Sequence, residues 1–381
     1  MIYLDNSATT KPDKAVLNSF MQVSERFYAN PSSIHQFGGE SEKLLYKART
    51  QAARLLEVDA EEVIFTSGGT EGNNMAIKGI AHQHRNRGKH IITSEIEHPS
   101  VYDACKSLEK EGYDITYVPV NKNGCVAVED VEKSIREDTI LISIMHVNNE
   151  IGSIQPIQSI GEMANRYPKL LFHVDNVQGF GKIPLNLKAC KIDFATISAH
   201  KIHGLRGNGI VYMNKSKRIA PLLDGGGQEN AKRPGTENLA GIVSMVKAMR
   251  LIKTREQRAL PALQEVGQYL RKGLKSIDKV FINSPEPPIG APHIVNFSIP
   301  GLKPEVVIHT LGEEDIFIST KSACSSKHMD DSRIVSACGF DGERSKSAMR
   351  VSLSYENTKA EIDTLLKHLQ QAVSYLTEVM G

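Results

Sequence analysis

Hydrophobic residues follow two different spacings along the chain, and each spacing predicts a different kind of element. Between residues 12 and 27 apolar side chains recur every three or four positions, which predicts a helix. The same spacing predicts a second helix over residues 41–56 and a long helical segment from about 235 to 274. From residue 63 onward, short runs rich in β-branched residues alternate with further helical segments. The strands predicted there cover residues 63–66, 90–93, 115–120, 139–147, 170–174, 194–198 and 209–213.

Several of these strands are apolar throughout, as expected for strands covered by helices on both faces. The alternation of strands and helices predicts an α/β fold with a mainly parallel central sheet between helices. After about residue 277 the pattern changes and predicts a smaller α+β C-terminal domain. Its predicted elements are strands over 294–299, 316–319 and 349–354 and helices over 305–311 and 359–380.

The chain of 381 residues is long enough to bury two hydrophobic cores. We expect a large domain over residues 16–260 and a small C-terminal domain over residues 261–381. Residues 1–15 are expected to form an N-terminal arm that groups with the small domain.

Charge and composition exclude several classes of protein. The 46 basic and 44 acidic side chains give a net charge of +2, without the basic footprint of a nucleic-acid-binding protein. The longest apolar run, near residues 140–147, is too short to cross a bilayer. The N-terminus shows no basic segment followed by an apolar stretch, so no secretory signal is visible. We expect a cytoplasmic protein that binds neither membranes nor nucleic acid directly.

The five cysteines are odd in number, widely scattered and never spaced as Cys-x-x-Cys. This pattern argues against a disulfide framework and against a structural zinc site. Four of them are expected to be small buried hydrophobic residues. Cys324 differs because it lies in a polar stretch beside Lys321, Lys327 and His328. Positive neighbours favour the thiolate, so Cys324 is a candidate nucleophile.

Three further motifs lie at or after the ends of predicted strands, where open α/β sheets bind ligands. Residues 66–74, Thr-Ser-Gly-Gly-Thr-Glu-Gly-Asn-Asn, open a helix and could hold a phosphate, with Thr70 as a hydroxyl donor. An ordinary capped turn is the alternative. Asp175 ends an apolar strand and could pair with a protonated pyridine nitrogen, with Gln178 near a phenolate oxygen. A helix N-cap is the alternative for Asp175.

Lys201 closes the third of these motifs, at the end of an apolar strand. Its amine could form a Schiff base with an aldehyde cofactor, while Ser198 and His200 supply phosphate donors. The His-x-x-His spacing that begins at His200 has no nearby carboxylate or thiolate to complete a metal site, so we expect no metal.

Together these motifs show a resemblance to a known family along the whole chain. The chain resembles the cysteine desulfurases of group I, the NifS/IscS-like branch of the class-V aminotransferase family, which are pyridoxal-phosphate (PLP) enzymes of fold type I. The segments that carry the resemblance are residues 3–10, 30–35, 67–71, 97–98, 146–150, 173–175, 198–201, 233–238 and 322–324. The chain departs from the usual pattern at Ser7, Asn176, Lys321 and the loop 203–209.

The resemblance implies a role for each matching residue around the cofactor ring. Lys201 would hold PLP covalently, Asp175 would pair with its ring nitrogen, and Gln178 would bond its phenolate oxygen. His98 would stack on the ring and act in proton transfer. Asn149 would lie at both the cofactor and the substrate.

The resemblance also implies how the phosphate and the substrate are held. Thr70, Ser198 and His200 would bind the phosphate, joined by Thr236 from the partner subunit of a homodimer. Arg350, with Asn149, would bind the carboxylate of L-cysteine. Cys324 would take the sulfur as a persulfide and leave L-alanine.

The implied activity is a PLP-dependent cysteine desulfurase. Its sulfur would pass to an acceptor protein, either an iron–sulfur scaffold or an enzyme of tRNA or cofactor thiolation. The alternatives are a selenocysteine lyase or an aminotransferase of the same fold, or a sulfur-carrier or scaffold protein without catalysis.

Overall fold

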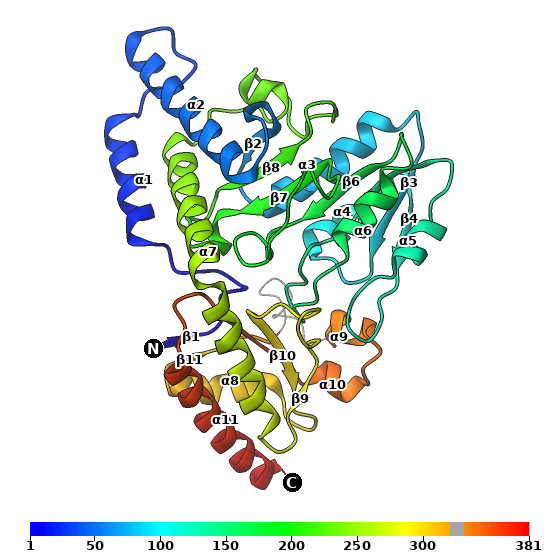
Figure 1. The fold of residues 1–381 in the computed structure, drawn as a ribbon, viewed down its shortest axis with the longest axis vertical. Helices are drawn as coiled ribbons and strands as arrows, with labels where there is room; N and C mark the ends of the chain where they lie inside the picture. Colours follow the sequence, from blue (N-terminus) through cyan, green and yellow to red (C-terminus); the bar gives the residue numbers. More distant parts are fainter. Residues whose placement is uncertain (321–330, 381) are drawn as a thin grey trace.

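The largest element of the protein is a seven-stranded sheet of order β2-β8-β7-β6-β5-β3-β4 (Figure 1). The computed structural model describes residues 1–320 and 331–380. The strands of this sheet are β2 (Val63–Thr66), β3 (His90–Ser94), β4 (Asp114–Val118), β5 (Thr139–Ser143), β6 (Leu171–Asp175), β7 (Phe194–Ser198) and β8 (Gly209–Met213). Strand β8 runs opposite to the other six strands, which share one direction, and this confirms the predicted mainly parallel sheet.

Helices cover both faces of the sheet, so neighbouring residues on one strand enter different cores. Ile91 packs in the core beneath the third and fourth helices, whereas Ile92 packs in the core on the opposite face. The helices on the Ile91 face of the sheet are α3 (Gly69–His84) and α4 (Pro99–Lys110). Those on the Ile92 face are α1 (Lys14–Arg26), α2 (Gln36–Leu56), α5 (Val128–Lys133), α6 (Ile157–Ala164) and the first half of α7 (Leu239–Lys275).

A second hydrophobic core lies at the C-terminal end of α7, around an antiparallel sheet of order β12-β10-β9 (Figure 1). Leu270 of α7 belongs to this core, while Met245 of the same helix belongs to the core of the large sheet. The strands and helices here are β9 (Phe281–Ile282), β10 (Ile294–Ser298), β12 (Ala348–Ser352), α8 (Pro304–Glu313), α9 (Arg333–Ala337), α10 (Gly342–Lys346) and α11 (Lys359–Met380). Short 3-10 turns occur at η1 (Ala60–Glu62), η2 (Ala199–Lys201) and η3 (Gln228–Ala231). The division at residues 260/261 stays a prediction, since α7 runs through it as one helix.

The N-terminal arm returns to this second core. Strand β1 (Ile2–Tyr3) pairs in parallel with β11 (Ile316–Phe317), and Asp5 forms a β-bridge with Ser352. Leu4 is fully buried in the second core. The first residues of the chain are therefore placed beside the end of β12.

Most elements differ from their predicted bounds by a few residues, and two of the larger differences are at α2 and β5. Helix α2 begins at Gln36 rather than residue 41, because the His35 side chain caps it by accepting a hydrogen bond from the Gly38 N–H at 3.0 Å. Strand β5 ends at Ser143 rather than residue 147. The Ile144 and His146 N–H groups still donate to the His173 and Asp175 carbonyls of β6, at 3.1 and 2.9 Å, before the chain turns at residues 148–152. In that turn Asn148 Oδ1 accepts from the Glu150 N–H at 2.8 Å. No helix in the described ranges is both long and apolar enough to span a membrane.

Candidate active site

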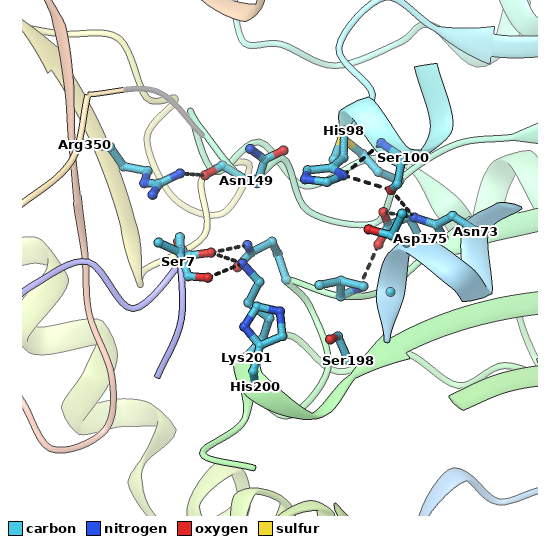
Figure 2. Close-up of a pocket in the computed structure, with 16 residues that line it drawn as sticks. Ser7, Asn73, His98, Ser100, Asn149, Asp175, Ser198, His200, Lys201 and Arg350 are labelled. Carbon is cyan, nitrogen blue, oxygen red and sulfur yellow. Dashed lines mark hydrogen bonds between the residues drawn. The ribbon is translucent and has the colours of Figure 1, made fainter. Parts of the chain in front are cut away.

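A cavity of about 150 Å³ lies at the carboxyl ends of the central strands, where the N-terminal arm and β12 close it (Figure 2). Nine of the predicted site residues line it. They are Thr70, His98, Asn149, Asp175, Gln178, Ser198, His200, Lys201 and Arg350. Thr236 does not line this cavity within its own chain, and Cys324 lies outside the described residues. The folded chain therefore brings together residues that are up to 280 positions apart in sequence (350 − 70).

Lys201 reaches the cavity from the 3-10 turn that follows β7. Its Nζ donates hydrogen bonds to the carbonyl oxygens of Ser7 and Ala8, the latter at 2.9 Å. Both acceptors belong to the N-terminal arm, so the arm holds the amine at the cavity wall (Figure 2). A primary amine in this position can act as a nucleophile toward a carbonyl group.

Asp175 is the buried acid of the site. Its Oδ2 accepts from Asn73 Nδ2 at 2.7 Å, and its Oδ1 accepts from the Val177 N–H at 2.9 Å. Burial raises the pKa of Asp175, while these two hydrogen bonds and the Lys201 charge act in the opposite direction. A cationic group in the cavity would favour the carboxylate, because an opposite charge stabilises the ionised form.

His98 stands at the N-cap of α4 and faces the cavity (Figure 2). Its Nδ1 accepts from the Ser100 N–H at 3.1 Å. Burial lowers the pKa of His98 to about 4, with smaller contributions from the charges of Lys201 and Arg333. At neutral pH the ring is therefore neutral, and because Nδ1 accepts, Nε2 carries the proton. His98 can present an N–H to a group in the cavity.

The opposite end of the cavity has the features of an anion site. Ser198 Oγ is buried and has no hydrogen-bond partner among the described residues. Beside it the N-terminus of α3 presents Gly69 and Thr70, and a Cβ on Gly69 would approach Val177 Cγ2 to 3.0 Å. Burial is the largest cause that lowers the pKa of His200 to about 4. Free N–H groups, hydroxyls and a helix N-terminus are suited to a phosphate.

Arg350 forms the wall of the cavity on the β12 side (Figure 2). Its side chain is 1% exposed, and Nη1 donates to the Asn149 carbonyl at 2.8 Å. Its Nε is buried and without a partner in the described ranges. A buried guanidinium with unused donors is suited to a carboxylate ligand.

Gln178 contacts the N-terminal arm. Its Nε2 donates to the Ser7 carbonyl at 3.0 Å, and its buried Oε1 has no partner within residues 1–320 and 331–380. Its amide therefore faces the N-terminal arm in this structure. The role predicted for it toward a ring oxygen stays a prediction.

Three contributors were not predicted from the sequence. Asn73 holds Asp175 and also donates to Ser100 Oγ at 2.8 Å. Ser100 in turn supports His98, and Asp5 is paired with Arg350. Asn73 could have been suspected, because a polar residue on the buried face of a helix needs a polar partner. Asp5 gives no local signal, since its partner is 345 positions away.

Within the described part of the chain, no group of three or more His, Cys, Asp or Glu side chains could hold a metal ion.

Glu97, next to His98, allows a test of the buried electrostatics. Its side chain is fully buried, and Oε1 accepts from Ser94 Oγ at 2.6 Å and from the Met145 N–H at 3.0 Å. Burial raises the pKa of Glu97 to about 8. The folded state then keeps a proton that the unfolded state releases, so this group's stabilising contribution is lost as pH rises from about 4.5 to about 8.

The variant Glu97→Gln removes this titration while keeping the shape of the side chain. At each pH we take the free energy of unfolding of the wild type and subtract that of the variant. We expect this difference to fall by roughly 2 kcal/mol between about pH 5.5 and about pH 7.5. Urea unfolding at the two pH values measures it, and the histidines shared by both proteins cancel. An unchanged difference would mean that Glu97 is ionised in the folded state.

Comparisons with known proteins agree with this geometry. The family model described as aminotransferase class-V matches residues 2–365. A NifS/IcsS protein homolog of Lactobacillus delbrueckii subsp. bulgaricus is 43% identical, over 100% of this chain and 99% of its own length. Cysteine desulfurase IscS of Dictyoglomus turgidum is 41% identical, over 99% of this chain and 96% of its own length.

A solved structure of a NifS-like protein superposes with a TM-score of 0.93 at 36% identity, covering 98% of this chain and 100% of that one. The similarity therefore includes both hydrophobic cores and the cavity between them. The chain belongs to the aminotransferase class-V family, in its NifS/IscS-like group of cysteine desulfurases.

Proposed function

We propose that this protein is a PLP-dependent cysteine desulfurase that converts L-cysteine into L-alanine and passes the sulfur to Cys324. The observation that carries the proposal is the convergence of Lys201, Asp175 and His98 on one cavity. The cavity belongs to a chain that is 41% identical to a cysteine desulfurase over 99% of its length.

The residues present fit PLP by their chemistry. Ser198 Oγ and Gln178 Oε1 are buried polar atoms without partners in the described ranges, as expected where a polar ligand completes the wall. Asp175 would face the ring nitrogen, His98 the ring face, and Lys201 the aldehyde carbon. Thr70, Ser198, His200 and the N-terminus of α3 would hold the phosphate. When bound, PLP supplies an electron sink for bond cleavage next to the substrate's amino-bearing carbon.

The chain's own residues would then position the substrate and move its protons. Arg350 and Asn149 bind the carboxylate, and Lys201 Nζ and His98 Nε2 are the groups within the cavity that hold protons. The Cys324 thiolate attacks the substrate sulfur, so that a sulfur–sulfur bond forms as the carbon–sulfur bond breaks. The electron pair of the broken bond stays on carbon, which takes a proton and becomes the methyl group of L-alanine.

A homodimer is part of the proposal, because Thr236 lies away from the cavity of its own chain. Exposed apolar side chains on α1, α2 and the loop between them support a partner surface. Met21 is 58% exposed, Tyr28 77% and Ile34 107%. Such a group of apolar side chains is typical of an interface between subunits. We propose that Thr236 of the partner subunit completes the phosphate site.

The sulfur would leave on an acceptor protein for iron–sulfur cluster assembly or for tRNA or cofactor thiolation. We place this activity in the cytoplasm. The four described cysteines, Cys105, Cys125, Cys190 and Cys338, are all free thiols, as is usual in a reducing compartment.

The activity is tested by incubating the PLP-loaded protein with L-cysteine and a thiol reductant. We expect L-alanine and sulfide in equal amounts. Turnover restricted to L-selenocysteine would indicate a selenocysteine lyase, and amino transfer to a 2-oxo acid would indicate an aminotransferase. A protein that stays colourless after incubation with PLP would favour a carrier or scaffold without catalysis.

A further inference from the structure

The guanidinium of Arg350 is held from two sides. Its Nη1 donates to the Asn149 carbonyl and its Nη2 donates to Asp5 Oδ1, both at 2.8 Å. The Arg350 side chain is 1% exposed and the Asp5 side chain 20% exposed. The pair is therefore largely shielded from solvent, where a charge-assisted hydrogen bond is strong and directional.

Backbone pairing fixes the place of Asp5 along β12. Ser352 N donates to the Leu4 carbonyl at 2.7 Å, and Asn6 N donates to the Ser352 carbonyl at 3.2 Å. Asp5 lies between these two bonds and bridges Ser352, two residues beyond Arg350 on the same strand. The Asp5 carboxylate therefore reaches Arg350 from a position set by main-chain hydrogen bonds.

The arm then continues directly to the lysine. Two residues after Asp5, the Ser7 carbonyl accepts from both Lys201 Nζ and Gln178 Nε2. Ser7 N is itself tied to Ser352 Oγ at 2.8 Å. One short segment therefore contacts the arginine at one end of the cavity and the lysine near its centre (Figure 2).

Asp5 restricts which donors of Arg350 are open to a ligand. With Asn149 and Asp5 each taking one terminal nitrogen, Nε remains buried and without a partner among the described residues. Among the described residues, Asp5 is the one acidic side chain that pairs with Arg350. Without Asp5 the guanidinium would lose this ion pair and the contact that fixes its plane. A misplaced carboxylate receptor weakens substrate binding because two parallel hydrogen bonds require one orientation.

We propose that Asp5 is a positioning residue that holds Arg350 in the orientation that receives the substrate carboxylate. This inference rests on the proposed function, in which Arg350 binds that carboxylate. Asp5 does not touch the reacting atoms and acts through Arg350. Its removal is therefore expected to affect only those ligands that carry a carboxylate.

Two ligands that differ only in the carboxylate provide the test. S-methyl-L-cysteine has a blocked sulfur, and 2-(methylthio)ethylamine is the same molecule without its carboxylate. Binding of each to the PLP-loaded protein is measured by isothermal titration calorimetry for the wild type, Asp5→Ala and Asp5→Asn. We expect Asp5→Ala to raise the dissociation constant of the amino acid at least about tenfold and to leave that of the amine within about twofold. Asp5→Asn keeps an acceptor oxygen and should recover most of the affinity.

The wild type separates failure of this inference from failure of the proposed function. If the wild type binds both ligands equally, Arg350 does not receive a carboxylate, and both the assignment of Arg350 and the role of Asp5 are overturned. If the wild type prefers the amino acid but Asp5→Ala weakens both ligands alike, or neither, the role of Asp5 alone is overturned. A matching melting temperature of Asp5→Asn and the wild type confirms that the arm remains in place.

Discussion

Replacing Lys201 by alanine is expected to lower the turnover of L-cysteine by at least about 10³-fold. Lys201 is the amine that lines the cavity beside Asp175 and His98, and its Nζ contacts the arm carbonyls of Ser7 and Ala8. In the proposed function, its loss removes both the covalent anchor for PLP and a group that moves protons. The visible absorption spectrum of the purified variant and its steady-state turnover measure the two effects separately.

A surface lysine provides the control for this variant. Lys188 is 49% exposed, pairs with Asp59 and Glu62, and does not line the cavity. Lys188→Ala should keep the spectrum and the turnover of the wild type. If the purified Lys201→Ala variant kept the wild-type absorption spectrum, another amine would anchor the cofactor.

The second large effect is expected for Asp175→Asn, with turnover reduced by roughly 10²-fold or more and weaker binding of PLP. The amide keeps an oxygen for the Val177 N–H, which Asp175 Oδ1 accepts at 2.9 Å, but it loses the negative charge. A neutral side chain cannot stabilise a protonated ring nitrogen, so the cofactor would be a poorer electron sink. Turnover at saturating PLP, together with the dissociation constant of PLP, measures this effect.

Asp193→Asn is a matched control, because Asp193 is also a buried acid beside the central sheet. It precedes the first residue of β7, at the end of the strand opposite the cavity, and its Oδ2 accepts from the Phe172 N–H at 3.0 Å. It pairs with Lys217 at 3.2 Å. We expect this variant to lose stability but to keep its turnover per folded molecule. Equal losses of turnover in both variants would indicate that Asp175 acts through general stability.

Local sequence was sufficient for the central strands and for most of the residues that carry chemistry. Strand β7 begins and ends at its predicted residues, because its buried run follows Asp193 and closes with Ser198, shortly before the polar pair His200 and Lys201. Lys201 and Asp175 could be singled out because each follows or ends such a strand, whereas the role of His98 follows only from the family resemblance. The start of α2 could not, since it depends on a histidine cap that apolar spacing does not record.

The supporting contacts of the site could not be predicted, because they join distant parts of the chain. Asn73 meets Asp175 over 102 positions and Asp5 meets Arg350 over 345. Neither pairing has a local pattern, and both arise only when the sheet and the arm are assembled. The roles of Thr236 and Cys324 stay predictions for different reasons. The role predicted for Thr236 would require a partner subunit, and Cys324 lies outside the described residues.

The most direct test of the account follows the sulfur atom in a single turnover. The PLP-loaded protein is mixed with less than one equivalent of ³⁵S-labelled L-cysteine without reductant, and both products are measured. We expect L-alanine and protein-bound persulfide in equal amounts, with the label on the peptide that contains Cys324. A thiol reductant should then release this label as sulfide. The Cys324→Ala variant should yield neither product while still binding L-cysteine. Full L-alanine formation by that variant, or label on another residue, would contradict the account.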